Sequence, residues 1–131
     1  MSKFLVTGGA GFIGSNIAEY LAQHGHFVRV LDDFSAGKPE NLEFAGKLGK
    51  DKFELIKGSI TDKAACEKAC QGMDYVLHQA GWRSVPKSMN DPEGYNETNI
   101  NGTLFMLQAA SKNKVRRFVF CPANVIIVSF G

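Results

Sequence analysis

A run of glycines near the start of the chain has the spacing of a phosphate-binding turn. Residues 7–14 read Thr-Gly-Gly-Ala-Gly-Phe-Ile-Gly and directly follow the short apolar run 4–6. Gly8 can take a backbone conformation closed to other residues, Gly11 lets the main chain approach a pyrophosphate closely, and Gly14 lets a helix pack tightly on a sheet. The first turn of that helix offers N–H groups and a partial positive charge to phosphates. The pattern predicts a dinucleotide site more strongly than a merely structural turn.

Two carboxylates follow the second apolar run of the chain. Asp32 lies 18 residues beyond Gly14, and Asp33 comes next. An acid about 20 residues after the last glycine commonly binds a ribose hydroxyl in dinucleotide sites. Two negative charges there repel a 2′-phosphate, so the pair predicts NAD rather than NADP. A site for S-adenosylmethionine also uses an acid at this place, but it usually has an acidic residue before its glycines, where Thr7 stands here.

The elements that must position these residues alternate along the chain. Short apolar runs predict strands over residues 4–6, 27–31, 53–56, 75–77 and 118–120, and helical spacing predicts helices over 13–21, 61–70 and 91–113. Thr61 or Asp62 suits an N-cap, as does Asp91 before Pro92. Strands separated by helices pair in parallel through right-handed crossovers. We therefore expect an α/β fold, a Rossmann-type doubly wound parallel sheet, in one domain over residues 1–131.

Composition narrows the class of protein. The chain has 131 residues, 44% of them hydrophobic and 21% charged, and a formal net charge of +2, which is typical of one globular domain and not of a collagen-like, disordered or coiled-coil chain. No apolar run is long enough for a membrane span. Cations at 112, 114, 116 and 117 are better explained by a solvated helix C-terminus than by a nucleic-acid patch. The chain starts without a recognisable leader, and its three cysteines (66, 70 and 121) do not make a zinc pattern, so we expect a cytoplasmic protein with free thiols and no metal site.

Four segments together resemble a known family. They are residues 7–14, the run Leu-Asp-Asp-Phe-Ser at 31–35 with Gly37 and Asn41-Leu42, His-Gln-Ala-Gly at 78–81, and Asn-Ile-Asn-Gly-Thr at 99–103. In this order they resemble the extended short-chain dehydrogenase/reductase family, in particular its NAD-dependent nucleotide-sugar epimerases. The segment 84–88, Ser-Val-Pro-Lys-Ser, is most similar to a loop of UDP-glucose and UDP-N-acetylglucosamine 4-epimerases.

The resemblance implies a set of binding residues. Cofactor contacts are expected from Gly8, Gly11, Phe12, Ile13, Gly14, Asp32, Asp33, Ser35, Gly37, Ser59, Ile60, Gln79, Ala80, Gly81, Arg83 and Asn99. By analogy, the amides of residues 12 and 13 would lie near the pyrophosphate, and Asp32 would hold the adenosine ribose. The residues along the nicotinamide would be Gln79, Ala80, Gly81 and Arg83. Ser84 would face a sugar substrate. The family usually has Gly-Asp-Ile after the third strand, with the acid at the adenine, whereas this chain has Ser59 there.

The catalytic residues of such epimerases are not found in this sequence. Their Tyr-x-x-x-Lys motif is missing, because the residues four beyond Tyr20, Tyr75 and Tyr95 are His, Gln and Asn. A serine-rich run is expected after the fifth strand, where Cys-Pro-Ala-Asn stands at 121–124. We therefore assign no catalytic residue. Residues 121–131 form a divergent apolar tail that favours a further strand completing the sheet over a contact with another chain.

These observations lead to one hypothesis and two alternatives. The hypothesis is a truncated NAD-binding part of a UDP-sugar 4-epimerase-like protein, without the C-terminal substrate domain and inactive alone. UDP-sugar would then bind only if a missing domain completed the site. The alternatives are a non-catalytic NAD-binding or regulatory module and a fragment without function. By analogy with the family, the helix starting near Asp91 would pair two copies in a homodimer.

Overall fold

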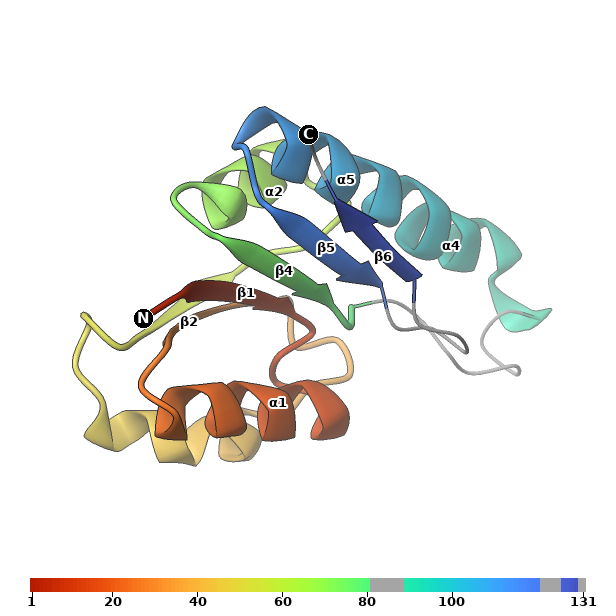
Figure 1. Ribbon diagram of the computed structural model, residues 1–131. Helices are drawn as coiled ribbons and strands as arrows, with labels where there is room; N and C mark the ends of the chain where they lie inside the picture. Colours follow the sequence, from red (N-terminus) through yellow and green to blue (C-terminus); the bar gives the residue numbers. More distant parts are fainter. Residues whose placement is uncertain (81–88, 121–125, 130–131) are drawn as a thin grey trace.

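A computed structural model describes residues 1–80, 89–120 and 126–129 of the chain. It has one six-stranded sheet with helices on both faces (Figure 1). The strands are β1 (Lys3–Thr7), β2 (Phe27–Asp32), β3 (Phe53–Lys57), β4 (Tyr75–His78), β5 (Arg117–Phe120) and β6 (Ile126–Ser129). The helices are α1 (Phe12–Gln23), α2 (Lys63–Cys70), α4 (Pro92–Asn96) and α5 (Gly102–Lys112), with a 3-10 segment η1 (Pro39–Lys47) and a π-helical segment η2 (Glu97–Asn101).

The sheet has the strand order β3-β2-β1-β4-β5-β6. The first five strands pair in parallel, and β6 runs antiparallel to β5. This confirms the predicted Rossmann-type sheet. The apolar tail also supplies a strand, as expected, because residues 126–129 pair with the sheet edge. The strand order reverses between β1 and β4, which is where open α/β sheets bind ligands.

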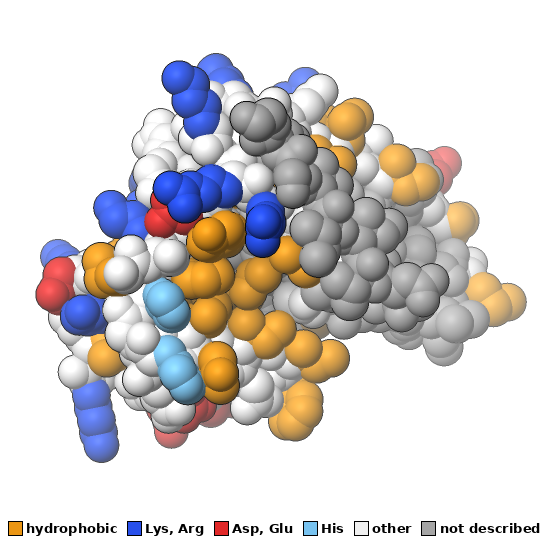
Figure 2. All heavy atoms as spheres, in the orientation of Figure 1, with side chains coloured by type: hydrophobic (Ala, Val, Ile, Leu, Met, Phe, Trp, Pro, Cys, Tyr) orange, Lys and Arg blue, Asp and Glu red, His pale blue; other side chains and the backbone are white. Residues whose placement is uncertain are grey.

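The two faces of the sheet are covered to different extents. The register places Leu5, Val76 and Phe118 in one row, and all three are fully buried on the face that carries α2 and α5. The neighbouring row on the opposite face holds Val6, which is buried in the cluster that packs against α1, whereas Leu77 and Val119 are only half-buried. Figure 2 shows hydrophobic side chains gathered on the face that Figure 1 presents.

The helix ends follow from local hydrogen bonds. The Asp62 carboxylate accepts hydrogen bonds from the amides of Ala64 and Ala65, so of the two predicted candidates Asp62 is the N-cap of α2. Asp91 likewise accepts from the amide of Gly94 at the start of α4. The long helix predicted over residues 91–113 is present over 92–112, where α4, the π-helical segment η2 and α5 follow one another without a gap. The polar segment after β2, for which no helix was predicted, contains η1.

Cys66 and Cys70 lie in α2 with both side chains fully buried as free thiols. Burial raises the pKa of each to about 12, and the charge of Asp62 adds to the effect at Cys66. Both thiols therefore pack in the core, and a buried thiol that stays protonated is unreactive. Within the ranges that the structure describes, no helix combines the length and apolar character needed to cross a bilayer.

Candidate dinucleotide-binding site

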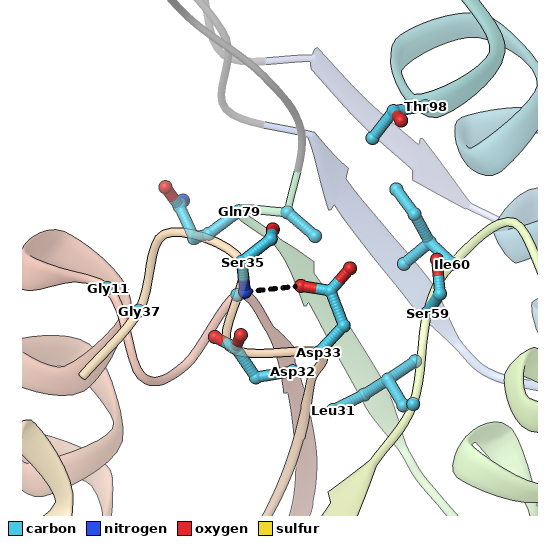
Figure 3. Close-up of a pocket in the computed structure, with 13 residues that line it drawn as sticks. Gly11, Leu31, Asp32, Asp33, Ser35, Gly37, Ser59, Ile60, Gln79 and Thr98 are labelled. Carbon is cyan, nitrogen blue, oxygen red and sulfur yellow. Dashed lines mark hydrogen bonds between the residues drawn. The ribbon is translucent and has the colours of Figure 1, made fainter. Parts of the chain in front are cut away.

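A pocket opens at the carboxyl ends of the parallel strands, on both sides of the point where the strand order reverses (Figure 3). It is lined by Gly8, Gly11, Leu31, Asp32, Asp33, Ser35, Gly37, Gly58, Ser59, Ile60, Gln79, Ala80 and Thr98. The glycine-rich turn after β1 and the loop after β2 form one side of it. The segment after β3, with Ser59 and Ile60, faces them, and Thr98 comes from η2.

The glycine-rich turn has no room for side chains. Gly8 has a φ of +67°, and a Cβ placed on it would lie 2.8 Å from the amide nitrogen of Ala80. A Cβ on Gly14 would contact the carbonyl oxygen of Gly8 and lie 3.0 Å from Gly9 Cα. Gly11 is the N-cap of α1 and supplies no capping side chain, so the first-turn amides of α1 remain for a ligand. The geometry therefore requires glycine at positions 8 and 14, while the contacts of this turn with a pyrophosphate stay predictions.

Asp32 fixes the turn to the loop that follows β2. Asp32 is 7% exposed, and its two carboxylate oxygens accept hydrogen bonds from the amides of Ala10 (2.9 Å) and Phe34 (2.7 Å). The carbonyl oxygen of Ala10 in turn accepts from the Lys38 amide (3.0 Å) and from Asn41 Nδ2 (2.8 Å). The sequence predicts Asp32 as a ribose ligand and gives no sign of this second role. The bonds hold the carboxylate at the pocket before any ligand arrives.

Asp33 and Ser59 face each other across the pocket with different surroundings (Figure 3). Asp33 is exposed, and one of its oxygens accepts a hydrogen bond from the Ser35 amide at 2.9 Å. The Ser59 hydroxyl accepts from the Thr61 amide at 3.1 Å and lies 2.8 Å from the Thr61 hydroxyl. The serine therefore belongs to the turn that leads into α2. It brings a neutral hydroxyl to the pocket where an acid would bring a charge.

The structure brings ten of the predicted residues together. Gly8, Gly11, Asp32, Asp33, Ser35, Gly37, Ser59, Ile60, Gln79 and Ala80 all line the pocket. Gly14 packs beneath the turn, and Asn99 lies in η2 outside the lining. Phe12 and Ile13 are 79% and 53% exposed and do not line the pocket, and the predicted contact of their amides with a pyrophosphate stays a prediction. Gly81, Arg83 and Ser84 lie outside the described residues.

Three lining residues were not predicted. Leu31 and Gly58 each precede a predicted residue at a strand end, so their position along the chain already carried the signal. Thr98 gave no comparable signal, because its place at the pocket depends on η2. A π-helical segment follows from packing more than from local sequence, and such segments are frequent at functional sites.

The sequence of this chain is similar to those of known proteins. The model of the NAD dependent epimerase/dehydratase family matches residues 4–126. The chain belongs to this family. It is 34% identical over 126 residues to a UDP-glucose 4-epimerase of Klebsiella pneumoniae, with 95% of this chain and 91% of that sequence covered.

Longer relatives share the same region. The chain is 30% identical to a 3 beta-hydroxysteroid dehydrogenase/Delta 5-->4-isomerase of Mycobacterium tuberculosis (strain H37Rv), with 98% of this chain and 33% of that sequence covered. It is similar to a crystal structure of UDP-glucose 4-epimerase from Stenotrophomonas maltophila with bound NAD and formylated UDP-arabinopyranose. That similarity has a TM-score of 0.82 and 32% identity, and it covers 92% of this chain and 36% of that one. The chain therefore spans about a third of these longer relatives.

The described residues fit a dinucleotide. The turn has glycines where a Cβ would meet backbone, which lets a ligand approach the main chain closely. The α1 N-terminus offers amides to an anion, and Asp32 and Asp33 offer acceptors to hydroxyl groups. Donors for phosphate and acceptors for ribose thus lie at neighbouring positions, as NAD requires.

Proposed function

We propose that this chain binds NAD in the pocket and is the NAD-binding part of a UDP-sugar 4-epimerase-like protein. The observation that carries the proposal is the crowded glycine-rich turn joined to a buried Asp32 at the end of β2. The α1 amides would bind the pyrophosphate, and Asp32 would accept from the adenosine ribose through its remaining lone pairs. Asp33, Ser35, Gly37, Ser59 and Ile60 would surround the adenosine. Gln79 and Ala80 would line the nicotinamide side.

Asp33 is the residue we expect to select NAD over NADP. Its carboxylate is exposed at the pocket, where a 2′-phosphate would add negative charge beside it. Calorimetric titration of the 131-residue chain should detect NAD binding and give an affinity for NADP weaker by about tenfold or more. The variant Asp33→Asn should narrow that ratio several-fold. As a matched control, Asp51→Asn removes an exposed carboxylate before the amino end of β3 and should leave the ratio unchanged.

Absence of heat with millimolar NAD in a folded chain would contradict the binding proposal. Equal affinities for NAD and NADP in the unmodified chain would contradict the role of Asp33 alone. The two results are therefore separable.

We propose further that the chain by itself does not epimerise a UDP-sugar. Bound NAD would supply a hydride acceptor for the sugar C4, but the sequence has no Tyr-x-x-x-Lys motif to move the proton. Incubation with NAD and UDP-glucose should therefore leave the substrate unchanged. Formation of the C4 epimer by the pure chain would contradict this part of the proposal. Because a steroid dehydrogenase/isomerase shares the same region, we expect residues outside it to determine which substrate is bound.

A homodimer is also proposed, with its contact along η2 and α5. Ile100 and Leu104 are 61% and 48% exposed there, four residues apart and so on one side of the segment. Sedimentation should show a dimer that Leu104→Glu dissociates. A monomer at high concentration would contradict this assignment without affecting NAD binding.

A further inference from the structure

A buried hydrogen-bond network lies directly beneath the nicotinamide side of the proposed site. Thr7 ends β1 and His78 ends β4, and the register pairs them across the two strands. Both side chains are fully buried. The Thr7 hydroxyl lies 2.6 Å from His78 Nδ1, and His78 Nε2 lies 3.1 Å from the hydroxyl of Thr103 in α5. The imidazole therefore links β1, β4 and α5 behind the pocket.

The Thr7 hydroxyl also holds the main chain that lines the pocket. The amides of Gln79 and Ala80 both donate to its oxygen, each at 3.1 Å. Gln79 donates in addition to the main-chain carbonyl of Thr7 at 3.1 Å, so the Ala80 amide is the more sensitive reporter of the hydroxyl. Both residues line the pocket, and Ala80 packs against Gly8 of the glycine-rich turn. Thr7 thus connects the imidazole to the pocket wall.

The donors and acceptors around the Thr7 hydroxyl point to one protonation state of the ring. A hydroxyl has one proton to donate and two lone pairs to accept with. Because the two amides can only donate, they take the lone pairs of Thr7, and its proton points to His78 Nδ1. Nδ1 is then unprotonated, and Nε2 carries the proton that it donates to Thr103. The network requires a neutral imidazole in the Nε2–H tautomer.

Aromatic packing holds the ring in this orientation. The imidazole lies 5.4 Å from the ring centroids of both Phe118 and Phe120, and it is nearly parallel to the second, at 28°. The ring plane is therefore set by β5, and its two nitrogens point to Thr7 and Thr103. Packing alone would not need both nitrogens of His78 to face hydroxyl groups.

We propose that His78 is a positioning residue for NAD: through the Thr7 hydroxyl, its neutral imidazole holds the Gln79 and Ala80 amides at the nicotinamide side of the pocket. This inference rests on the proposed function and adds a residue that touches no ligand. The part of His78 that matters is the acceptor at Nδ1. A side chain that keeps an acceptor there should preserve the network, and one that only fills the space should not.

Substitution at His78 tests that acceptor. His78→Asn places an amide oxygen near the position of Nδ1, whereas His78→Leu fills the space without an acceptor. Titration of the full chain should show NAD affinity within about threefold of the unmodified protein for His78→Asn and about tenfold weaker for His78→Leu, as expected when a buried donor loses its partner. Unchanged affinity in His78→Leu would overturn the proposal.

A second pair of variants covers the case in which His78→Leu does not fold. Thr7→Val removes the hydroxyl while keeping the shape of the side chain, and Thr7→Ser keeps the hydroxyl. We expect about tenfold weaker NAD binding for Thr7→Val and recovery for Thr7→Ser. Equal affinities of the two variants would overturn the proposal.

Nuclear magnetic resonance tests the network without any cofactor. Long-range proton–nitrogen correlations of the His78 ring should show Nε2 protonated and Nδ1 unprotonated. The Ala80 amide signal should shift in Thr7→Val and stay close to its original position in Thr7→Ser. A proton on Nδ1 would overturn the proposal. Failure of the unmodified chain to bind NAD would instead contradict the proposed function, because the ring spectrum does not depend on NAD.

Discussion

Glycine has different roles at the two ends of the parallel strands, which we call the carboxyl edge and the amino edge of the sheet. Gly8, at the carboxyl edge of the strands, has a φ of +67° and backbone within 3 Å of the place where its Cβ would be. Gly25 and Gly72, which precede strands at the amino edge, have φ values of +82° and +74° and nothing within 4 Å of that place. Glycine at the amino edge serves the turn alone. At the carboxyl edge glycine also leaves free the volume that a Cβ would occupy, and the proposed site lies at that position.

Polar side chains differ between the edges in the same way. At the carboxyl edge Asp32 is buried and accepts from two backbone amides, and Thr7 and His78 are fully buried and bonded to each other. At the amino edge the half-buried Asp74 accepts from the Lys3 amide, and the nearby Arg116 and Arg117 are exposed. Burying polar groups away from water costs free energy. Their concentration at the carboxyl edge therefore indicates that ligand contacts there are preorganised.

The largest expected effect comes from adding one methyl group at each edge. Gly8→Ala should destabilise the chain by more than 2 kcal/mol, because it combines backbone strain of about 1–2 kcal/mol with a contact against the Ala80 amide. It should also weaken NAD binding by about tenfold or more. Gly25→Ala carries the strain alone and should leave binding intact. Urea unfolding measures the loss of stability, and calorimetry measures the NAD affinity. Equal effects of the two variants would show that Gly8 and Gly25 do not differ in role.

The two aspartates give the next largest difference. Asp32→Asn turns one acceptor into a donor facing a backbone amide, which should destabilise the chain by about 2 kcal/mol and weaken NAD binding. Asp74→Asn alters one exposed hydrogen bond from the Lys3 amide and should cost about 0.5 kcal/mol, with no effect on NAD. Thermal unfolding with and without NAD checks both. A larger loss for Asp74→Asn would show that the amino edge is the more tightly built one.

The thiols of α2 report how far water is excluded from the core between the two edges. The pKa values of Cys66 and Cys70 are raised from 9.0 to about 12, so folding favours the protonated thiol. The stabilising contribution of the two thiols to the free energy of unfolding is complete below pH 9 and is lost as the pH rises from about 9 to 12. The loss is on the order of 1 kcal/mol per thiol at pH 10. Urea unfolding at pH 8 and pH 10 should show this loss. A double variant with alanine at both positions should show less of it, and an equal loss would mean that other groups cause the dependence.

The smallest expected effect concerns one residue of the carboxyl edge. Ser59→Asp restores the acid that the family usually has, and a carboxylate can still accept from the Thr61 amide. It should raise NAD affinity by about fivefold through the adenine amino group, which is about 1 kcal/mol. Nicotinamide hypoxanthine dinucleotide, which lacks that amino group, is the matched ligand. An equal gain for both ligands would place the effect elsewhere.

How far the sequence predicts these features depends on how local they are. The strands, the Asp62 cap and the crowded glycine turn were predicted, because they follow from residue type and short-range spacing. η1 and η2 were not, since a 3-10 or π segment is selected by packing around it. The bonds of Asp32 to Ala10 and of His78 to Thr103 join residues 22 and 25 positions apart, so a pattern of neighbours could not indicate them.

The close approach of α5 to the pocket has a consequence for motion. A Cβ on Gly102 would lie 2.6 Å from the Ile60 side chain, so the helix begins almost in contact with a residue of the pocket wall. The next residue, Thr103, is hydrogen-bonded to His78. The first turn of α5 therefore contacts Ile60 in the pocket wall and His78 beneath the pocket through two adjacent residues. A ligand that stiffens the pocket wall or the network beneath it should slow amide hydrogen exchange in this turn, and the effect would then pass along the helix to the surface around Leu104.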